Sequence, residues 1–244
     1  MNKILSLNPT QTIFVLATAT IMSCFYLVQG IAHATSTTPT DKQQGNLVSI
    51  QNKGMDEINQ RFITLNNLST QVSSSTKLTP SDQASLSSQI TTTVTSLTAL
   101  KTQLATDTTV DQASTDVAGI FSNFRVYALV VPKVQLITIT DNQLNIESQL
   151  SAKVQLLQAQ IAANTSTAKS VSTAKILLTG MNNLVTSSQT ISSTVRNDTI
   201  SLQPSNWNAN HNILSGDRTQ LTIAYKDNAK ANIEANTIAN LLNK

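Results

Sequence analysis

The sequence predicts an all-α protein, an elongated antiparallel helical bundle of about five helices, four of them long, after an N-terminal signal or anchor segment. Aromatic residues make up only 4% of the 244 residues, and Gly and Pro number 6 and 5. Sandwiches and barrels need more turns and more ring-filled cores than this composition supplies. Apolar residues also recur every three or four positions along most of the chain, which is the spacing of one helix face.

Residues 1–34 predict a signal peptide or membrane anchor. The run Ile13–Val28 carries no charge, and the small residues Ala32 and Ala34 follow it as a cleavage site would require. We therefore expect cleavage after Ala34 and an extracytoplasmic location, whether secreted, periplasmic or at the cell surface. The alternative is an uncleaved anchor, because residues 13–31 approach the ~20 residues that span a bilayer.

The only cysteine, Cys24, lies inside this segment, so the mature chain is expected to have no thiol. A lipoprotein signal ending at Cys24 is a weaker alternative, because apolar residues continue directly after it. Residues 35–45 are rich in polar residues and Pro and predict a disordered linker. The helical bundle domain is then expected to occupy residues 46–244.

The first two predicted helices form a hairpin. The first begins near Leu47 and ends at the Ser/Thr run before Lys77. The second begins with Thr79 as a cap, Pro80 in the first helical position and Asp82 at the positive end of the helix dipole. Their apolar faces are Met55, Ile58, Phe62, Leu65, Leu68 and Val72, and Leu86, Ile90, Val94, Leu97 and Leu104.

A third element runs from about Val110 to Ile161, roughly 75 Å if it is one helix of 1.5 Å per residue. The fourth helix has a coiled-coil seam in which Ser188 fills an otherwise empty heptad position. Residues 202–210 predict a non-helical loop, since they contain Pro and several Asn. The last helix has a small-residue face. The faces of the last two helices are Ala174, Leu177, Met181, Leu184, Ile191 and Val195, and Leu214, Leu221, Ala224, Ala231, Ala235, Ile238 and Leu242.

The stretch 121–140 holds the densest run of large aliphatic residues. Apolar side chains lie nearly all round it, which predicts a helix enclosed by others and kinked near Pro132. The alternative is a β-hairpin that turns at Pro132 and Lys133, although the Gly or Asn of a tight hairpin turn is missing. A membrane-spanning role is disfavoured because Arg125 and Lys133 would be buried in lipid.

We expect no catalytic, cofactor-binding or metal-binding residues. His211 has no Asp or Glu within five residues, so it is expected to be a surface or capping residue. Asp107, Asp111 and Asp116 lie near a helix start, where acids offset the dipole without calcium. The net charge of +3 comes without a Lys or Arg run, which argues against nucleic acid. The sole Trp, Trp207, is expected to pack its loop onto the bundle.

Two stretches carry a resemblance, Phe124–Lys133 and Trp207–His211. They resemble uncharacterised secreted helical proteins, known from predicted sequences of uncultivated bacteria, that share a signal peptide and this helix order. The resemblance implies export and an all-helical fold, and it implies no catalytic residue.

The sequence thus favours an exported, non-enzymatic helical-bundle protein that acts as a cell-envelope interaction or structural module. We expect an unknown protein partner in the envelope. Self-association is also possible, because the coiled-coil faces are flanked by neutral polar residues and have little charge patterning that would prevent it. Membrane contact is expected only through residues 13–31, if they stay attached. The alternative is a membrane-active protein, similar to helical pore-forming toxins, that conceals residues 121–140.

Overall fold

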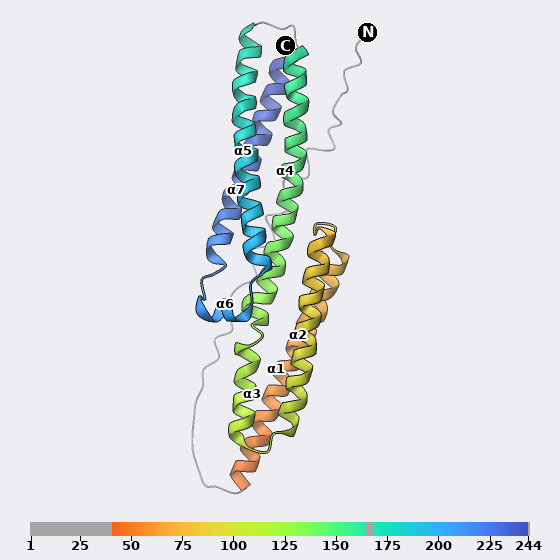
Figure 1. Ribbon diagram of the computed structural model, residues 1–244, viewed down its shortest axis with the longest axis vertical. Helices are drawn as coiled ribbons and strands as arrows, with labels where there is room; N and C mark the ends of the chain where they lie inside the picture. The colour runs from red at the N-terminus through yellow and green to blue at the C-terminus, as the bar shows by residue number, and fades with distance from the viewer. Residues whose placement is uncertain (1–40, 164–167, 244) are drawn as a thin grey trace. The chain divides into compact units, whose positions relative to one another are not determined.

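The computed structural model describes residues 41–163 and 168–243, and these are almost entirely helical, without a strand (Figure 1). The all-α prediction is therefore confirmed. The expected signal segment 1–34 and the linker up to residue 40 lie outside the described residues. The elements are α1 (Asp41–Ser74), α2 (Pro80–Thr106), α3 (Val110–Ser122), the π-helix η2 (Val126–Val130), α4 (Val131–Ala163), α5 (Ala168–Ile200), α6 (Pro204–Ala209) and α7 (Ser215–Leu242).

The helix starts agree with the sequence except at the first helix. α1 begins at Asp41, so residues 41–45 are helical where the sequence predicts linker. α2 begins as expected: the Thr79 side chain accepts a hydrogen bond from the Asp82 backbone N–H, and Pro80 opens the helix. Five helices are long, one more than predicted, because the last helix, α7, has 28 residues. The third predicted element is divided into the short α3, η2 and the long α4.

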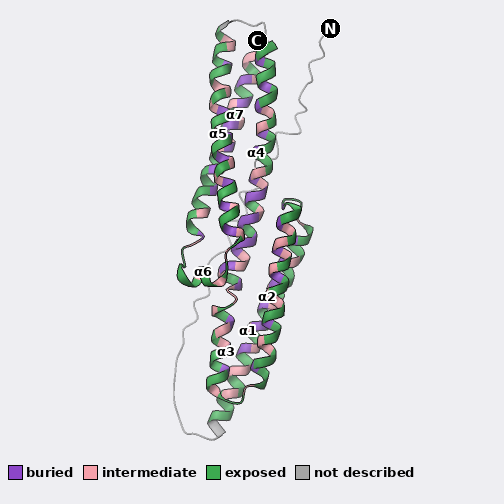
Figure 2. Cartoon of the chain, in the orientation of Figure 1, coloured by how far each residue is buried: buried purple, intermediate pink, exposed green. Residues whose placement is uncertain are grey.

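Three apolar clusters form the interior. One lies among α1, α2, α3 and the start of α4, and includes Ile58, Leu97 and Ile120. A second joins the far half of α4 to α5 and α7 through residues such as Met181 and Ile238. A smaller third cluster surrounds Leu129, Leu136, Val195, Leu214 and Leu221. Figure 2 shows the buried residues following the inward faces of the helices.

The single long helix predicted from about 110 to 161, with a kink near Pro132, is wrong in detail. The chain breaks at Asn123–Arg125, where Arg125 has a φ of 45° in the left-handed region. The π-helix η2 follows, and Pro132 is the second residue of α4. Proline is tolerated in the first turn of a helix, so Pro132 does not need to kink α4. The break in the helix is instead at Arg125, seven residues before Pro132. The hairpin alternative is also contradicted, because 126–140 is helical.

The stretch 121–140 is enclosed on one side only. Val126, Leu129 and Ile137 are at most 1% exposed, but Phe121 and Tyr127 are 43% and 45% exposed. The guanidinium of the buried Arg61 lies over both exposed rings, 4.7 Å from the Phe121 centroid and 5.1 Å from that of Tyr127. A cation over an aromatic face is attractive, so α1 covers these rings with an arginine instead of an aliphatic side chain.

The loop predicted at 202–210 contains the short helix α6. Pro204 occupies its first position, where the missing N–H is not needed, and the Asn206 side chain accepts the Gln203 backbone N–H at 2.7 Å. Pro204 and Asn206 therefore help to start this helix, so the predicted non-helical loop at 202–210 is wrong for residues 204–209.

Candidate functional site

A buried charge cluster joins α2, α4 and α5. Arg196 of α5 holds Asp82 of α2 in a two-bond ion pair, with N–O distances of 2.5 and 2.6 Å. Its Nε also lies 3.7 Å from an oxygen of Asp141 on α4. Asp141 accepts the Thr79 backbone N–H at 2.7 Å, at the start of α2. Both aspartates are 2% exposed, so one arginine serves two buried carboxylates.

Two groups of this region have displaced pKa values. Burial, and then the neighbouring Asp82, raise the pKa of Asp141 to about 6, although the Thr79 N–H and Arg196 act in the opposite direction. Burial lowers the pKa of Lys133 to about 8. The Lys133 amine donates to the Gln89 side-chain oxygen at 2.7 Å and to the Leu202 carbonyl, both neutral groups.

A second polar cluster lies inside the α4–α5–α7 packing. Glu147 of α4 is fully buried, and its Oε1 accepts hydrogen bonds from Ser188 and from Ser192, the latter at 2.8 Å. Asn228 of α7 donates to the same oxygen at 3.2 Å and to Gln143 at 2.8 Å. These bonds connect three helices through their buried faces.

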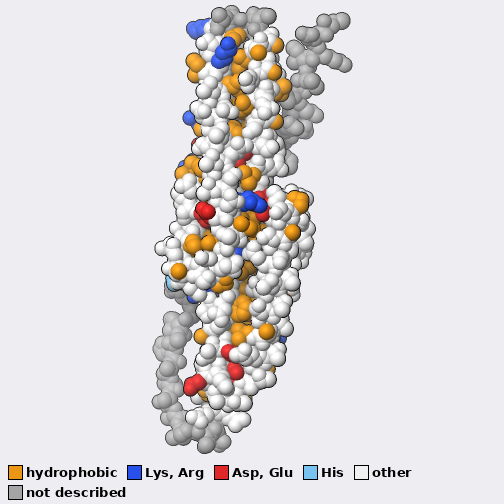
Figure 3. Space-filling view, in the orientation of Figure 1, with side chains coloured by type: hydrophobic (Ala, Val, Ile, Leu, Met, Phe, Trp, Pro, Cys, Tyr) orange, Lys and Arg blue, Asp and Glu red, His pale blue; other side chains and the backbone are white. Residues whose placement is uncertain are grey.

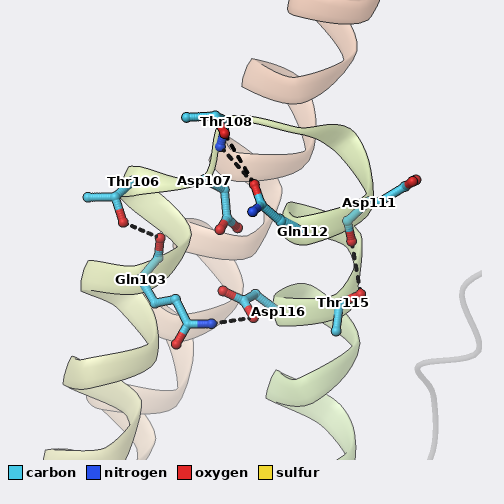
Figure 4. A pocket seen from close by; sticks show the side chains of 8 residues that line it. All are labelled: Gln103, Thr106, Asp107, Thr108, Asp111, Gln112, Thr115 and Asp116. Carbon is cyan, nitrogen blue, oxygen red and sulfur yellow. Dashed lines mark hydrogen bonds between the residues drawn. The ribbon is translucent and has the colours of Figure 1, made fainter.

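A small acidic pocket lies at the turn from α2 to α3 (Figure 4). The carboxylates of Asp107 and Asp116 point toward each other there, while the Asp111 side chain points away. Gln103 of α2 donates to Asp116 at 2.9 Å. Burial, followed by the charge of Asp116, raises the pKa of the Asp107 carboxyl.

The helix-dipole explanation of these three acids fits only Asp111. This residue lies in the first turn of α3, close to the Thr109 cap. Asp116 is the seventh residue of that helix, and only 8% of it is exposed. The dipole effect falls off within the first turn, so Asp116 needs another reason for its position.

The aromatic residue and the histidine of the Asn-rich loop lie together. Trp207 is half-buried and packs against the cluster around Leu129 and Leu214, as the sequence predicts. His211 is exposed, and its ring centroid lies 5.8 Å from that of Trp207. His211 thus lies at the surface, in agreement with its predicted position.

The two stretches that carry the sequence resemblance come together in the fold. Arg125, at the break between α3 and η2, donates to the Asn208 side chain at 2.6 Å. Asn208 in turn donates to the Ser122 carbonyl at 2.9 Å, at the end of α3. α6 therefore braces the backbone break by hydrogen bonds to both of its sides.

Neither a metal cluster nor a clear membrane span emerges from the described part of the chain. Within it, no group of three or more His, Cys, Asp or Glu side chains is placed to hold a metal ion. One helical stretch, Val110–Ala163, is long and apolar enough to cross a membrane, a test that core helices of soluble proteins also pass.

Comparison with protein-family models, with curated proteins and with solved structures finds no match to this chain.

Proposed function

We propose that this chain is an exported, non-enzymatic helical-bundle protein that acts as an interaction or structural module of the cell envelope. The observation that supports the proposal is that buried polar side chains of the bundle form hydrogen bonds and ion pairs between its helices. Arg196 bridges α5 to α2 and α4, and Glu147 bridges α4 to α5 and α7. These groups connect helices to one another and do not line a substrate cavity. A scaffold that must keep one arrangement of long helices would use them in this way.

The surface is consistent with a protein-binding role. The face in Figure 3 is mostly covered by uncharged polar side chains and backbone, with few charges and scattered apolar atoms. Three aliphatic side chains are more than half exposed on the α4–α5–α7 helices: Leu156 at 56%, Ile176 at 70% and Ile233 at 65%. Such side chains on a weakly charged surface favour contact with a protein partner, including a second copy of the chain.

Export is tested by expressing the full chain with a C-terminal tag in a bacterial host, followed by fractionation and mass measurement of its N-terminus. The proposal predicts an extracytoplasmic chain that begins at Thr35. A chain that starts at Met1 and remains in the cytoplasm would contradict it.

Partner binding is tested by chemical cross-linking in the envelope fraction and by sedimentation of the purified protein. We expect a defined cross-linked complex, hetero- or homomeric, that is weakened by Ile176→Ser or Ile233→Ser. The matched control is Ser193→Ala, an exposed α5 residue with no apolar area to lose. A monomer without cross-links under all conditions would exclude the interaction role.

The second candidate is a membrane-active protein, which the exposed Phe121, Tyr127 and Ile139 favour. It predicts dye leakage from liposomes and the loss of leakage in Ile139→Asp, whose exposed position leaves the core intact. Val130→Asp should also abolish leakage, but Val130 packs against the first apolar cluster, so its folding must be checked. Absence of leakage from pH 4 to pH 8 would exclude this candidate.

A further inference from the structure

Asp107 and Asp116 form an unusual pair at the α2–α3 turn. Asp107 is the first residue after α2, and Asp116 faces it from α3 (Figure 4). One oxygen of each carboxylate, Oδ2 in both residues, is inaccessible to solvent, and no residue outside the pair donates a hydrogen bond to it. Asp116 is also more than nine-tenths buried, and it lines the pocket together with Asp107.

The geometry is unfavourable for two free carboxylates. Their negative charges face each other, and an anion that is withdrawn from water without a partner is costly. Uncharged polar side chains also line the pocket, among them Gln103, Thr108 and Gln112. Gln103 donates its amide N–H to Asp116, so one oxygen of that carboxylate has a partner and the other has none outside the pair.

We propose that Asp107 and Asp116 together bind a divalent, oxygen-preferring cation, Ca²⁺, in the pocket between α2 and α3. Hard cations bind carboxylates together with neutral oxygens and retained water, and two carboxylates match the charge of one divalent ion. Ca²⁺ fits better than Mg²⁺, because Mg²⁺ demands near-ideal octahedral geometry and this lining mixes a turn with two helices. The bound ion would fasten the end of α2 to α3.

Two carboxylates and an open pocket predict weak binding, with a Kd on the order of 10⁻⁴–10⁻³ M. Calorimetric titration of the full chain with CaCl₂ should detect it, with NaCl at equal ionic strength as the reference. Asp116→Asn should weaken binding at least about tenfold, because it removes one of the two charges. The matched control Asp198→Asn, at an exposed position on α5 outside the pocket lining, should leave binding unchanged.

Thermal melting gives an independent signature. Without calcium, Asp116→Asn and Asp107→Asn should both melt above the wild type, because each relieves like-charge repulsion. With about 10 mM CaCl₂, above the expected Kd, the wild type should gain stability while the two variants do not. A variant that gains stability without calcium is folded, so its loss of binding reports on the site.

Three results would overturn the proposal. The first is no binding heat and no calcium-dependent melting shift in the wild type. The second is unchanged calcium binding in both Asp116→Asn and Asp107→Asn. The third is a wild-type protein whose stability rises on acidification and does not change with calcium. That result would show that Asp107 and Asp116 share a proton instead of binding a cation.

Discussion

Glu147 is the most completely buried charged residue of the described chain, and all three donors to its Oε1 come from other helices. A buried acceptor of this kind is stabilising only while its donors remain in place. Ser192 has a single role here, since its hydroxyl donates to Glu147 at 2.8 Å.

Ser192→Ala should therefore lower the free energy of unfolding by about 1–2 kcal/mol, because a charged acceptor loses one donor. The neighbouring Ser193 is exposed, and Ser193→Ala should change it by less than about 0.5 kcal/mol. Urea denaturation of both variants measures the difference. Equal effects in the two variants would show that Glu147 does not depend on this bond.

Asp141 makes stability depend on pH. Because its pKa in the folded chain is raised to about 6, the folded state binds the proton more tightly than the unfolded state. Its favourable contribution is complete below the unfolded pKa of about 4 and is lost as the pH rises through about 6.

Asp141→Asn should consequently become more stable relative to wild type as the pH rises from about 4 to 7, by on the order of 2 kcal/mol. The asparagine oxygen can still accept the Thr79 N–H. Asp56→Asn, at an exposed position on α1, serves as the control and should show no such pH dependence. Parallel stability curves for Asp141→Asn and wild type between pH 4 and 7 would contradict the assignment.

At Gly54, α1 packs tightly against side chains of α2 and α3. A Cβ added there would lie 2.5 Å from a Leu104 methyl and 2.7 Å from a Val117 methyl, both closer than real contacts allow. Gly45, on the same helix, has nothing within 4 Å of such an atom.

Gly54→Ala should therefore destabilise the protein by about 1–3 kcal/mol through overpacking, despite the better helix propensity of alanine. Gly45→Ala has only the propensity effect and should stabilise it by about 0.5–1 kcal/mol. Thermal or urea unfolding of the pair measures both signs. A stabilising Gly54→Ala would show that α1 does not pack this closely.

Much of this helical framework could be predicted from the sequence, because each long helix has one apolar face and recognisable ends. Thr79 and Pro80 mark the start of α2 by local chemistry alone. The break at Arg125 could not be predicted in the same way, since no Gly or Pro marks it. It is held by Asn208, which is 83 residues away in the sequence.

The buried polar clusters were missed for a related reason. Asp82 reads as a dipole-favouring acid at a helix start, and only the fold shows Arg196 beside it. Glu147 did carry a signal: it precedes Leu150 and Val154 at helix-face spacing, and all three are buried. A charged residue in line with an apolar face indicates a buried polar partner. Ser188, the polar residue in the seam of the fourth predicted helix, is such a partner, because its hydroxyl donates to Glu147.

In the molecule as a whole, buried polar contacts join helices that are distant in the sequence. Asp82 and Arg196 are the sharpest case, because they are 114 residues apart and joined by two charge-assisted hydrogen bonds.

The most direct test is a double-mutant cycle of Asp82→Asn and Arg196→Met, measured by urea denaturation at pH 7. We expect a coupling free energy of at least about 1.5 kcal/mol, because Arg196→Met leaves the buried carboxylate of Asp82 without its charged partner. The control cycle of Asp82→Asn with Lys230→Met, an exposed α7 residue, should be additive to within about 0.5 kcal/mol. Additive effects of Asp82→Asn and Arg196→Met would show that α2 and α5 are not joined through this pair.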